Sequence, residues 1–250
     1  MTVENITAVE GTGLTFTVTL DNAVQGAFDV IVSLANVTAT GGAAPLVTPE
    51  DFDDEVGTLS FTGNAGEEQT FTVATLDDVV VDGTETFTVN LDATNALITD
   101  SDTGTGTITD SDMAGLIVIE TQDSSVITES GTTDTIEVTL TTQPLTDVVL
   151  TITSDDTSEV TVDQDTLTFM PSDWNVPQTV TITGVRDLLD DGDQQTAIIV
   201  SVDPGSSDDA FDLVSDLSIE ATTVDEPVDQ LAITLSDEAL IVSNSVTGAV

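Results

Sequence analysis

Residues 76–87 of this 250-residue chain concentrate the side chains that could do chemistry. They hold four carboxylates around the glycine Gly83: Asp77, Asp78, Asp82 and Glu85. Negative charges this close repel one another unless a cation neutralises them. The chain has no His and no Cys, so the available ligand atoms are oxygens, which suit a hard cation. Ca²⁺ binds about 6–8 oxygen atoms and is therefore the ion that this segment predicts.

Two alternating segments flank the acidic loop and would hold it in place. Thr70–Val73 precedes the loop and Phe87–Leu91 follows it, and in both segments apolar residues alternate with polar ones. This period of two is typical of β-strands with one buried face. Further carboxylates stand in predicted turns elsewhere, among them Glu10, Asp110 and Asp112. Because loops at one end of a β-sandwich gather residues from distant strands, we expect these groups to meet.

The charge balance limits the kinds of partner. The chain carries 47 acidic residues and one basic residue, Arg186, for a formal net charge of −46. Without a cationic patch, direct binding to nucleic acid is excluded and anionic membrane surfaces are disfavoured. Such self-repulsion is tolerated when cations bind, or when salt screens charges beyond roughly 8–10 Å. Both conditions fit an extracellular location, so we expect a secreted or bacterial cell-surface protein.

The residue types that the chain lacks narrow the function further. His, Cys, Tyr and Lys are absent, so the usual general bases and nucleophiles of enzymes are missing. Paired carboxylates can hydrolyse glycosides, but the aromatic content of 4% offers little to line a sugar cleft. We therefore expect no enzymatic activity. No apolar run approaches the ~20 residues of a membrane span, so membrane insertion is not expected either.

The strand pattern predicts an all-β chain built from repeats. Residues 1–112 contain about seven short alternating segments with frequent turn signals, which favours an antiparallel, Ig-like two-sheet β-sandwich. The pattern then restarts, because Thr135–Leu140 matches Leu14–Leu20 and Thr166–Phe169 matches Thr58–Phe61. The period is on the order of 110 residues, which is the size of a sandwich domain. The fold class is therefore predicted to be tandem antiparallel β-sandwich domains.

Three segments follow from this repeat. We expect a first sandwich at residues 1–112, a second and divergent sandwich at 113–227, and a third repeat or an exchanged strand beginning at 228–250. The third segment is suggested by Leu231–Leu235, which resembles Leu116–Glu120. Nothing at the start of the chain matches Leu116–Glu120, so we expect the first repeat to lack its opening strand. The chain therefore looks like a segment of a longer array.

Taken together, the motifs resemble the Calx-beta repeat family. The resemblance covers residues 3–112 well and 113–227 more loosely. It rests on Val9-Glu10-Gly11, Asp51-Phe52, Asp77-Asp78, the run Asp82–Phe87, and Gly104–Ile108 followed by Asp110-Ser111-Asp112. The resemblance implies an antiparallel sandwich that binds Ca²⁺ at one end. It also implies repeated copies within large extracellular, adhesin-type bacterial proteins.

The resemblance further implies the ligands of the first repeat. Eight carboxylates match the family's positions: Glu10, Asp51, Asp77, Asp78, Asp82, Glu85, Asp110 and Asp112. The carbonyl oxygen of Val80 matches a backbone ligand, and Ser111 stands where a third aspartate is usual. Eight carboxylates could serve two or more ions that share bridging groups. The alternative is that these clusters are only turns on an acidic surface.

The second repeat offers a poorer site. Three of its ligand positions hold residues without a carboxylate: Arg186, Gln194 and Pro227. The remaining metal candidates are Glu129, Asp187, Asp191, Asp225 and Glu226. We expect calcium binding to be weak or absent there. Arg186 would either supply a tethered positive charge in place of an ion or pair with a nearby surface aspartate. The sole tryptophan, Trp174, is expected to pack at the edge of the sandwich.

These predictions combine into one leading hypothesis. The chain is a structural, non-catalytic repeat of a long extracellular adhesin or surface fibre, and bound Ca²⁺ stiffens it. Its partners would be neighbouring repeats of the same chain or fibre. Two alternatives remain open: a module that binds glycan or protein on a host or abiotic surface, and a filament subunit that assembles by strand exchange.

Overall fold

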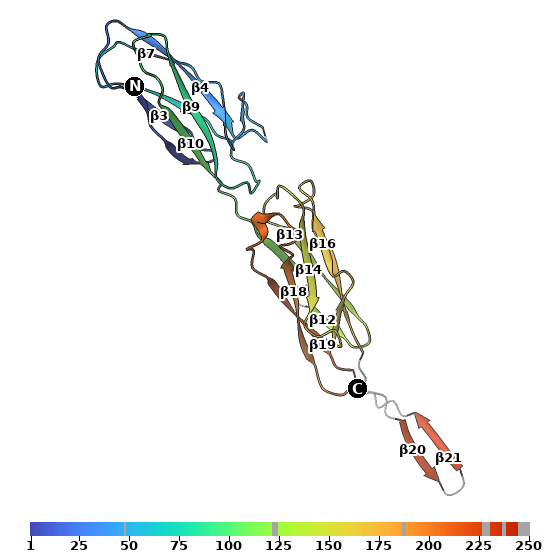
Figure 1. Ribbon diagram of the computed structural model, residues 1–250. Helices are drawn as coiled ribbons and strands as arrows, with labels where there is room; N and C mark the ends of the chain where they lie inside the picture. Colours follow the sequence, from blue (N-terminus) through green and yellow to red (C-terminus); the bar gives the residue numbers. More distant parts are fainter. Residues whose placement is uncertain (48, 122–124, 187–188, 227–230, 237–238, 245–250) are drawn as a thin grey trace. The chain divides into compact units, whose positions relative to one another are not determined.

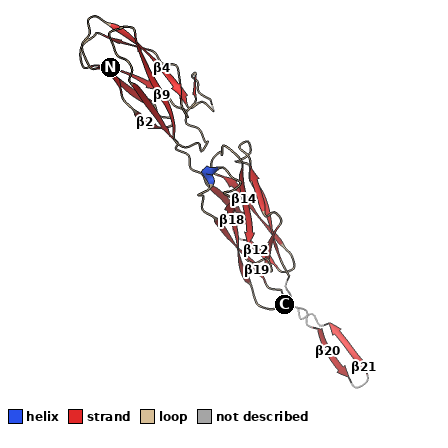
Figure 2. Cartoon of the chain, viewed as in Figure 1, coloured by secondary structure: helices blue, strands red, loops and turns tan. Residues whose placement is uncertain are grey.

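The computed structural model describes residues 1–47, 49–121, 125–186, 189–226, 231–236 and 239–244 (Figure 1). These residues form β-strands and their connections, and the helical element among them is a 3-10 turn, η1 (Asp209–Phe211; Figure 2). The predicted all-β class is confirmed. The chain divides into two compact parts, unit 1 at Met1–Met113 and unit 2 at Ala114–Val250. Within the described ranges, no helix has the length and apolar character needed to cross a membrane.

Unit 1 contains two β-sheets. The first has the order β1-β3-β8, with β1 (Thr2–Val3), β3 (Leu14–Leu20) and β8 (Glu67–Val73). The second has the order β2-β10-β9-β4-β7, with β2 (Ile6–Val9), β10 (Thr103–Thr109), β9 (Glu85–Ala93), β4 (Phe28–Asn36) and β7 (Thr58–Phe61). A short parallel ladder joins β5 (Gly41–Gly42) to β6 (Phe52–Asp53). Apolar residues alternate with threonine along β3, so one face of this strand is buried and the other is not.

Unit 2 repeats this plan. Its first sheet has the order β11-β13-β17-β15, with β11 (Leu116–Glu120), β13 (Thr133–Leu140), β17 (Gln178–Gly184) and β15 (Val160–Val162). Its second sheet has the order β12-β19-β18-β14-β16, with β12 (Ser125–Thr128), β19 (Leu217–Val224), β18 (Gln194–Val202), β14 (Val148–Ser154) and β16 (Thr166–Phe169). The predicted internal repeat therefore has a counterpart in the strand order of the two units.

Each unit has its own hydrophobic core between its sheets. In unit 1, the ring of Phe52 stacks on that of Phe87 with centroids 4.2 Å apart, and both side chains are 0% exposed. In unit 2, Trp174 is partly buried and packs against the core, as the sequence predicts. The stacked pair in unit 1 connects the core to the predicted ligands, because Phe52 directly follows Asp51 and Phe87 lies near the start of β9.

Besides the short β5–β6 ladder, one strand pairing in each unit departs from the predicted antiparallel plan. β2 runs parallel to β10, with Ile6 opposite Gly106, and β12 runs parallel to β19, with Ser125 opposite Ala221. The cause is a crossing early in each unit: after β1 pairs in the first sheet, the chain passes to the second sheet and adds β2 at its edge. The first and last strands of that second sheet along the chain therefore run side by side in the same direction.

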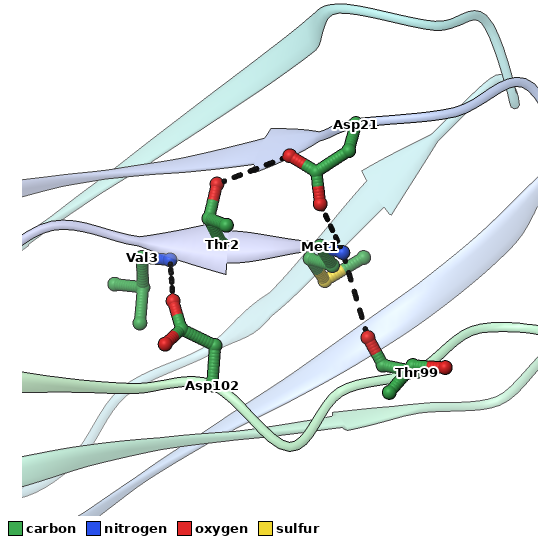
Figure 3. Close-up of polar contacts among 6 residues, drawn as sticks. All are labelled: Met1, Thr2, Val3, Asp21, Thr99 and Asp102. Atoms are coloured by element: carbon green, nitrogen blue, oxygen red, sulfur yellow. Dashed lines mark hydrogen bonds and ion pairs between the residues drawn. The ribbon is translucent and has the colours of Figure 1, made fainter.

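The expectation that the first repeat lacks its opening strand needs correction. Thr2 and Val3 form β1 opposite Thr19 and Val18 of β3, in the place that β11 takes beside β13. Figure 3 shows the contacts that hold this strand: the Val3 N–H donates to Asp102 at 2.9 Å, and the Thr2 hydroxyl donates to Asp21 at 3.3 Å. Two residues are too few to show a strand pattern in the sequence.

The two strands that follow β19 along the chain pair with each other. β20 (Leu231–Ser236) pairs antiparallel with β21 (Ala239–Asn244), with Leu231 opposite Asn244. The predicted third repeat at 228–250 falls partly outside the described residues, and together with the boundaries at 112 and 227 it stays a prediction.

Candidate metal centre

Backbone hydrogen bonds gather four distant segments of unit 1 at one end of the sandwich. The Glu10 N–H donates to the Thr109 carbonyl at 3.0 Å, which ties the end of β2 to the end of β10. The Gly11 N–H donates to the Leu76 carbonyl at 3.0 Å, and the Leu76 N–H donates to the Asp51 carbonyl at 3.0 Å. The acidic loop after β8 is therefore fixed between the segment before β6 and the turn after β2.

Six carboxylates converge at this end, which we call the unit 1 tip. They line one small cavity together with three other residues, and they are Glu10, Asp51, Asp78, Asp82, Glu85 and Asp110. The cavity has a volume of about 10 Å³, which is close to the least that one water-sized particle needs. The tip therefore has room for an ion but not for an organic ligand.

Two groups of three carboxylates are close enough to share an ion. Glu10, Asp110 and Asp112 each offer one oxygen within 4.8 Å of the others, and so do Asp51, Asp82 and Glu85. All six side chains are half-buried. Oxygens this close can coordinate one cation, and the two groups face the same cavity through Glu10, Asp51, Asp82, Glu85 and Asp110.

The first group is held rigidly by backbone donors. Asp110 accepts through Oδ2 from the N–H groups of Asp82 and Gly83, at 3.1 and 3.0 Å, and through Oδ1 from the N–H of Asp112 at 2.7 Å. Gly83 has a φ of +79°, which glycine adopts without strain. Glu10 accepts from the N–H and the hydroxyl of Ser111, at 2.8 and 2.9 Å. Ser111 thus orients a carboxylate in place of adding one.

The second group is anchored through the core. Asp51 accepts from the Thr40 N–H at 2.6 Å, and the next residue, Phe52, is buried against Phe87. Glu85 begins β9, two residues before Phe87. The aromatic stack therefore fixes the backbones that carry Asp51 and Glu85.

Burial and neighbouring charges raise the pKa of four carboxyl groups at or beside the tip. Burial raises the pKa of Glu85 to about 8, with further contributions from a hydrogen bond with Asp51 and from the charges of Asp51 and Asp82. Burial and the charges of Asp110 and Asp51 raise the pKa of Asp82 to about 7. Burial is also the main cause of the raised pKa of Glu10 and of Asp112. The tip is therefore electrostatically unfavourable when all its carboxylates are ionised.

One carboxylate oxygen beside the tip lacks a hydrogen-bond partner among the described residues, as does Oδ1 of Asp225 in unit 2. The first of these, Oδ2 of Asp112, is buried. Buried polar atoms are normally paired, so this oxygen calls for an explanation. Its carboxylate belongs to the first group of three, where an ion would be its partner. The residues present thus fit an oxygen-coordinated metal.

Three predicted ligands remain, and their roles are untested like those of the other six. Asp78 lines the cavity and accepts from the Val80 N–H at 2.8 Å, while Val80 itself is buried. Asp77 belongs to neither group of three, although its charge helps to raise the pKa of Asp112. All nine ligand assignments in unit 1 stay predictions.

Unit 2 keeps the scaffold of the tip with fewer ligands. Oxygens of Glu129, Asp191 and Asp225 lie within 4.8 Å of one another. The Gly192 N–H donates to Asp225 at 2.9 Å, as Gly83 does to Asp110 in unit 1. Glu226 contributes its N–H to Glu129 at 3.5 Å. Of the remaining candidates, Asp187 lies outside the described residues, and Arg186 is exposed.

Sequence reasoning missed Glu159 in unit 2. Its carbonyl accepts from the Val185 N–H at 2.8 Å, as the Asp51 carbonyl accepts from Leu76, so Glu159 occupies the position of Asp51. It is 5% exposed, and the buried Val160 follows it as Phe52 follows Asp51. A signal was present in the sequence. Glu159 stands as far before Thr166 as Asp51 stands before Thr58, at the start of the matching strands.

No family model and no curated protein matches the chain, whereas solved structures do. The calcium binding domain CBD12 of CALX1.1 is similar with a TM-score of 0.41 and 17% identity, covering 90% of this chain and 100% of that one. The titin domains z1z2 are similar with a TM-score of 0.39 and 12% identity, covering 91% and 95%. The Apo-form Calx CBD1 domain has a TM-score of 0.34 and 20% identity, covering 45% and 100%.

All three TM-scores are below 0.5, so these likenesses carry no weight for function. The titin domains score about as well as the domain described as calcium binding. The function of the chain has to be inferred from the two tips themselves.

Proposed function

We propose that the unit 1 tip binds Ca²⁺ and that the ion stiffens a structural, non-catalytic repeat. The observation that carries this proposal is the convergence of six carboxylates on one cavity of about 10 Å³. Oxygen ligands without nitrogen or sulfur favour a hard cation. Ca²⁺ is favoured over Mg²⁺ because it accepts about 6–8 ligands in irregular geometry, whereas Mg²⁺ demands a near-ideal octahedron.

An ion at the tip would join segments that are far apart in the sequence. Glu10 follows β2, Asp51 precedes β6, Asp82 lies in the loop after β8, and Asp110 follows β10. A cation shared by these groups removes their mutual repulsion and resists their separation. A site filled at about 100 times its Kd adds about 2.7 kcal/mol to the free energy of unfolding. Ion binding would thereby add a further link between four segments that backbone hydrogen bonds already hold together.

The wider role follows from the charge and the repeat. A chain with net charge −46 gains most from bound cations where calcium is abundant, which supports an extracellular location. Two successive sandwich units on one strand plan suit an array, so we propose a repeat of a long adhesin or surface fibre on or outside a bacterial cell. Neighbouring repeats of the same chain or fibre would be its partners.

Calcium titration by calorimetry tests the proposal directly. The full chain should bind Ca²⁺ with an enthalpy signal that Asp110→Asn weakens, because Asp110 anchors the loop and faces the cavity. Asp92→Asn is the matched control, since it removes one charge from an exposed position on β9 that the tip does not use. Absence of binding in the unmodified chain, or equal losses in both variants, would contradict the proposal.

A further inference from the structure

The edge of unit 2 at β11 carries an unusual set of side chains. β11 is the terminal strand of its sheet, and β13 is its neighbour in the sheet order. Ile117 and Ile119 are 42% and 54% exposed on its outer face. Val126 of β12, the terminal strand of the other sheet, is 56% exposed. Three β-branched apolar residues therefore stand in solvent on two terminal strands of one sandwich.

Unit 1 has polar residues at the same three positions. Val18 and Val138 each lie two residues before the leucine that ends their strand, β3 or β13. Val3 pairs with Val18 and Val118 pairs with Val138, so Val3 corresponds to Val118. The residues on either side of Val3, Thr2 and Glu4, therefore correspond to Ile117 and Ile119. Thr7 corresponds to Val126 by the pairing of β2 with β10 and of β12 with β19. The fold therefore tolerates polar residues here, and packing within the unit does not require the isoleucines.

Along the edge that faces away from β13, β11 has no paired strand among the described residues. The Thr141 N–H donates to the Gly115 carbonyl at 3.0 Å, and the Thr121 N–H donates to the Thr135 carbonyl at 3.2 Å. In an antiparallel ladder alternate residues face the partner strand, so residues 115, 117, 119 and 121 point their polar groups toward β13. The N–H and C=O groups of Leu116, Val118 and Glu120 consequently face away from it, toward the open edge.

We propose that β11 pairs with β11 of a second copy of this chain, forming a two-fold symmetric dimer. A terminal strand with unpaired backbone groups and exposed apolar side chains is a template for another strand. The charge of the strand indicates which partner it would bind. Leu116–Ile119 carries no charge, although the chain has a net charge of −46. This segment therefore suits another uncharged apolar strand and has no acidic group to attract a basic strand. A second copy supplies such a strand.

Two-fold pairing about Val118 is self-complementary. It sets Val118 opposite its own copy, Ile117 opposite Ile119, and Leu116 opposite Glu120. The residues whose polar groups face the open edge then pair with one another, as the ladder requires. The isoleucines of both copies meet on one face, and the two Glu120 side chains stay about 13 Å apart along the strands. A closed, isologous contact of this kind ends at a dimer.

Sedimentation equilibrium of the full chain tests the proposal. EDTA is present throughout, so the outcome does not depend on the proposed ion. We expect a monomer–dimer equilibrium that strengthens between low and high salt, because screening reduces repulsion between the acidic copies. The double variant Ile117→Thr/Ile119→Asp introduces polar residues like those of unit 1 and should weaken the dimer at least about tenfold.

Two further variants separate edge pairing from other causes. Glu120→Pro removes an outward N–H and also one negative charge, so loss of the dimer in this variant cannot be attributed to added repulsion. Thr168→Glu places a charge at an exposed position of β16, the terminal strand opposite β12 in the other sheet, and should leave the dimer unchanged. A monomer at every concentration and salt, or a dimer that persists in the double variant, would overturn the proposal.

Discussion

The two tips share a scaffold and differ in their ligands. In both units a glycine N–H holds an aspartate after the last strand, Gly83 to Asp110 and Gly192 to Asp225. A glutamate follows the parallel edge strand in each, and its N–H bonds back to the last strand. The side chains around this frame differ, since unit 2 has Gln194 at the position of Glu85. The frame is thus a property of the fold, and the capacity for an ion depends on the residues placed on it.

Chelation should give the largest effect and separates the two units. With Ca²⁺ replaced by EDTA, unit 1 should lose about 2.7 kcal/mol for each site previously filled at about 100 times its Kd, lowering its melting temperature by about 10 °C or more. Unit 2 should change much less because it offers fewer ligands. Differential scanning calorimetry would show one transition moving and one staying. Equal shifts of both transitions would contradict a difference in calcium binding between the two units.

Matched substitutions at the anchoring aspartates should give the next largest effect. Asp110→Asn removes a charged ligand from the unit 1 tip and should lower calcium affinity on the order of tenfold or more. Asp225→Asn makes the same change in unit 2 and should leave the measured affinity unchanged. Calorimetric titration of both variants checks this. An equal loss from Asp225→Asn would show that unit 2 binds the ion as well.

Adding carboxylates to the unit 2 site should create calcium binding there. Arg186→Asp with Gln194→Glu restores two carboxylates at the unit 2 positions that correspond to Asp77 and Glu85. Together with Glu129, Asp191 and Asp225, these should add a calcium-binding event, seen as a higher stoichiometry in titration. Arg186→Gln is the control, because it removes the positive charge without adding a ligand. Unchanged stoichiometry in the double variant would mean that the two tips differ in more than these side chains.

In the ion-free protein, the free energy of unfolding should also depend on pH. The pKa values of Asp82 and Glu85 are raised to about 7 and about 8, so the folded state holds their protons more tightly than the unfolded state does. Stability should therefore fall as pH rises from about 4 to about 8, and level off above. Denaturant unfolding in EDTA measures this. Glu85→Gln should flatten the upper part of the curve; an unchanged slope would argue against Glu85 as its source.

Much of this architecture could be predicted from the sequence, and the failures have physical causes. Alternation of apolar residues and threonine identifies strands such as β3 and the repeat of Thr58–Phe61 as Thr166–Phe169. The parallel placement of β2 could not be predicted, because alternation reports which face of a strand is buried and not which strand lies beside it. Residue types likewise suggested acidic ligands, whereas the grouping of Asp51 with Asp82 and Glu85 depends on how the chain before β6 folds across the end of the sandwich.

The parallel pairing of β2 with β10 has a mechanical consequence. The chain runs from β1 into the start of β2 and leaves unit 1 after the end of β10. Tension that passes β1 therefore pulls β2 and β10 in opposite directions along their common axis. The backbone hydrogen bonds between them are then loaded in shear, all at once and not one after another as in unzipping. Glu10 and Asp110 extend directly from these two strands. A cation bound by both side chains would add resistance to sliding of β2 against β10, at the end of β10 where the force leaves unit 1.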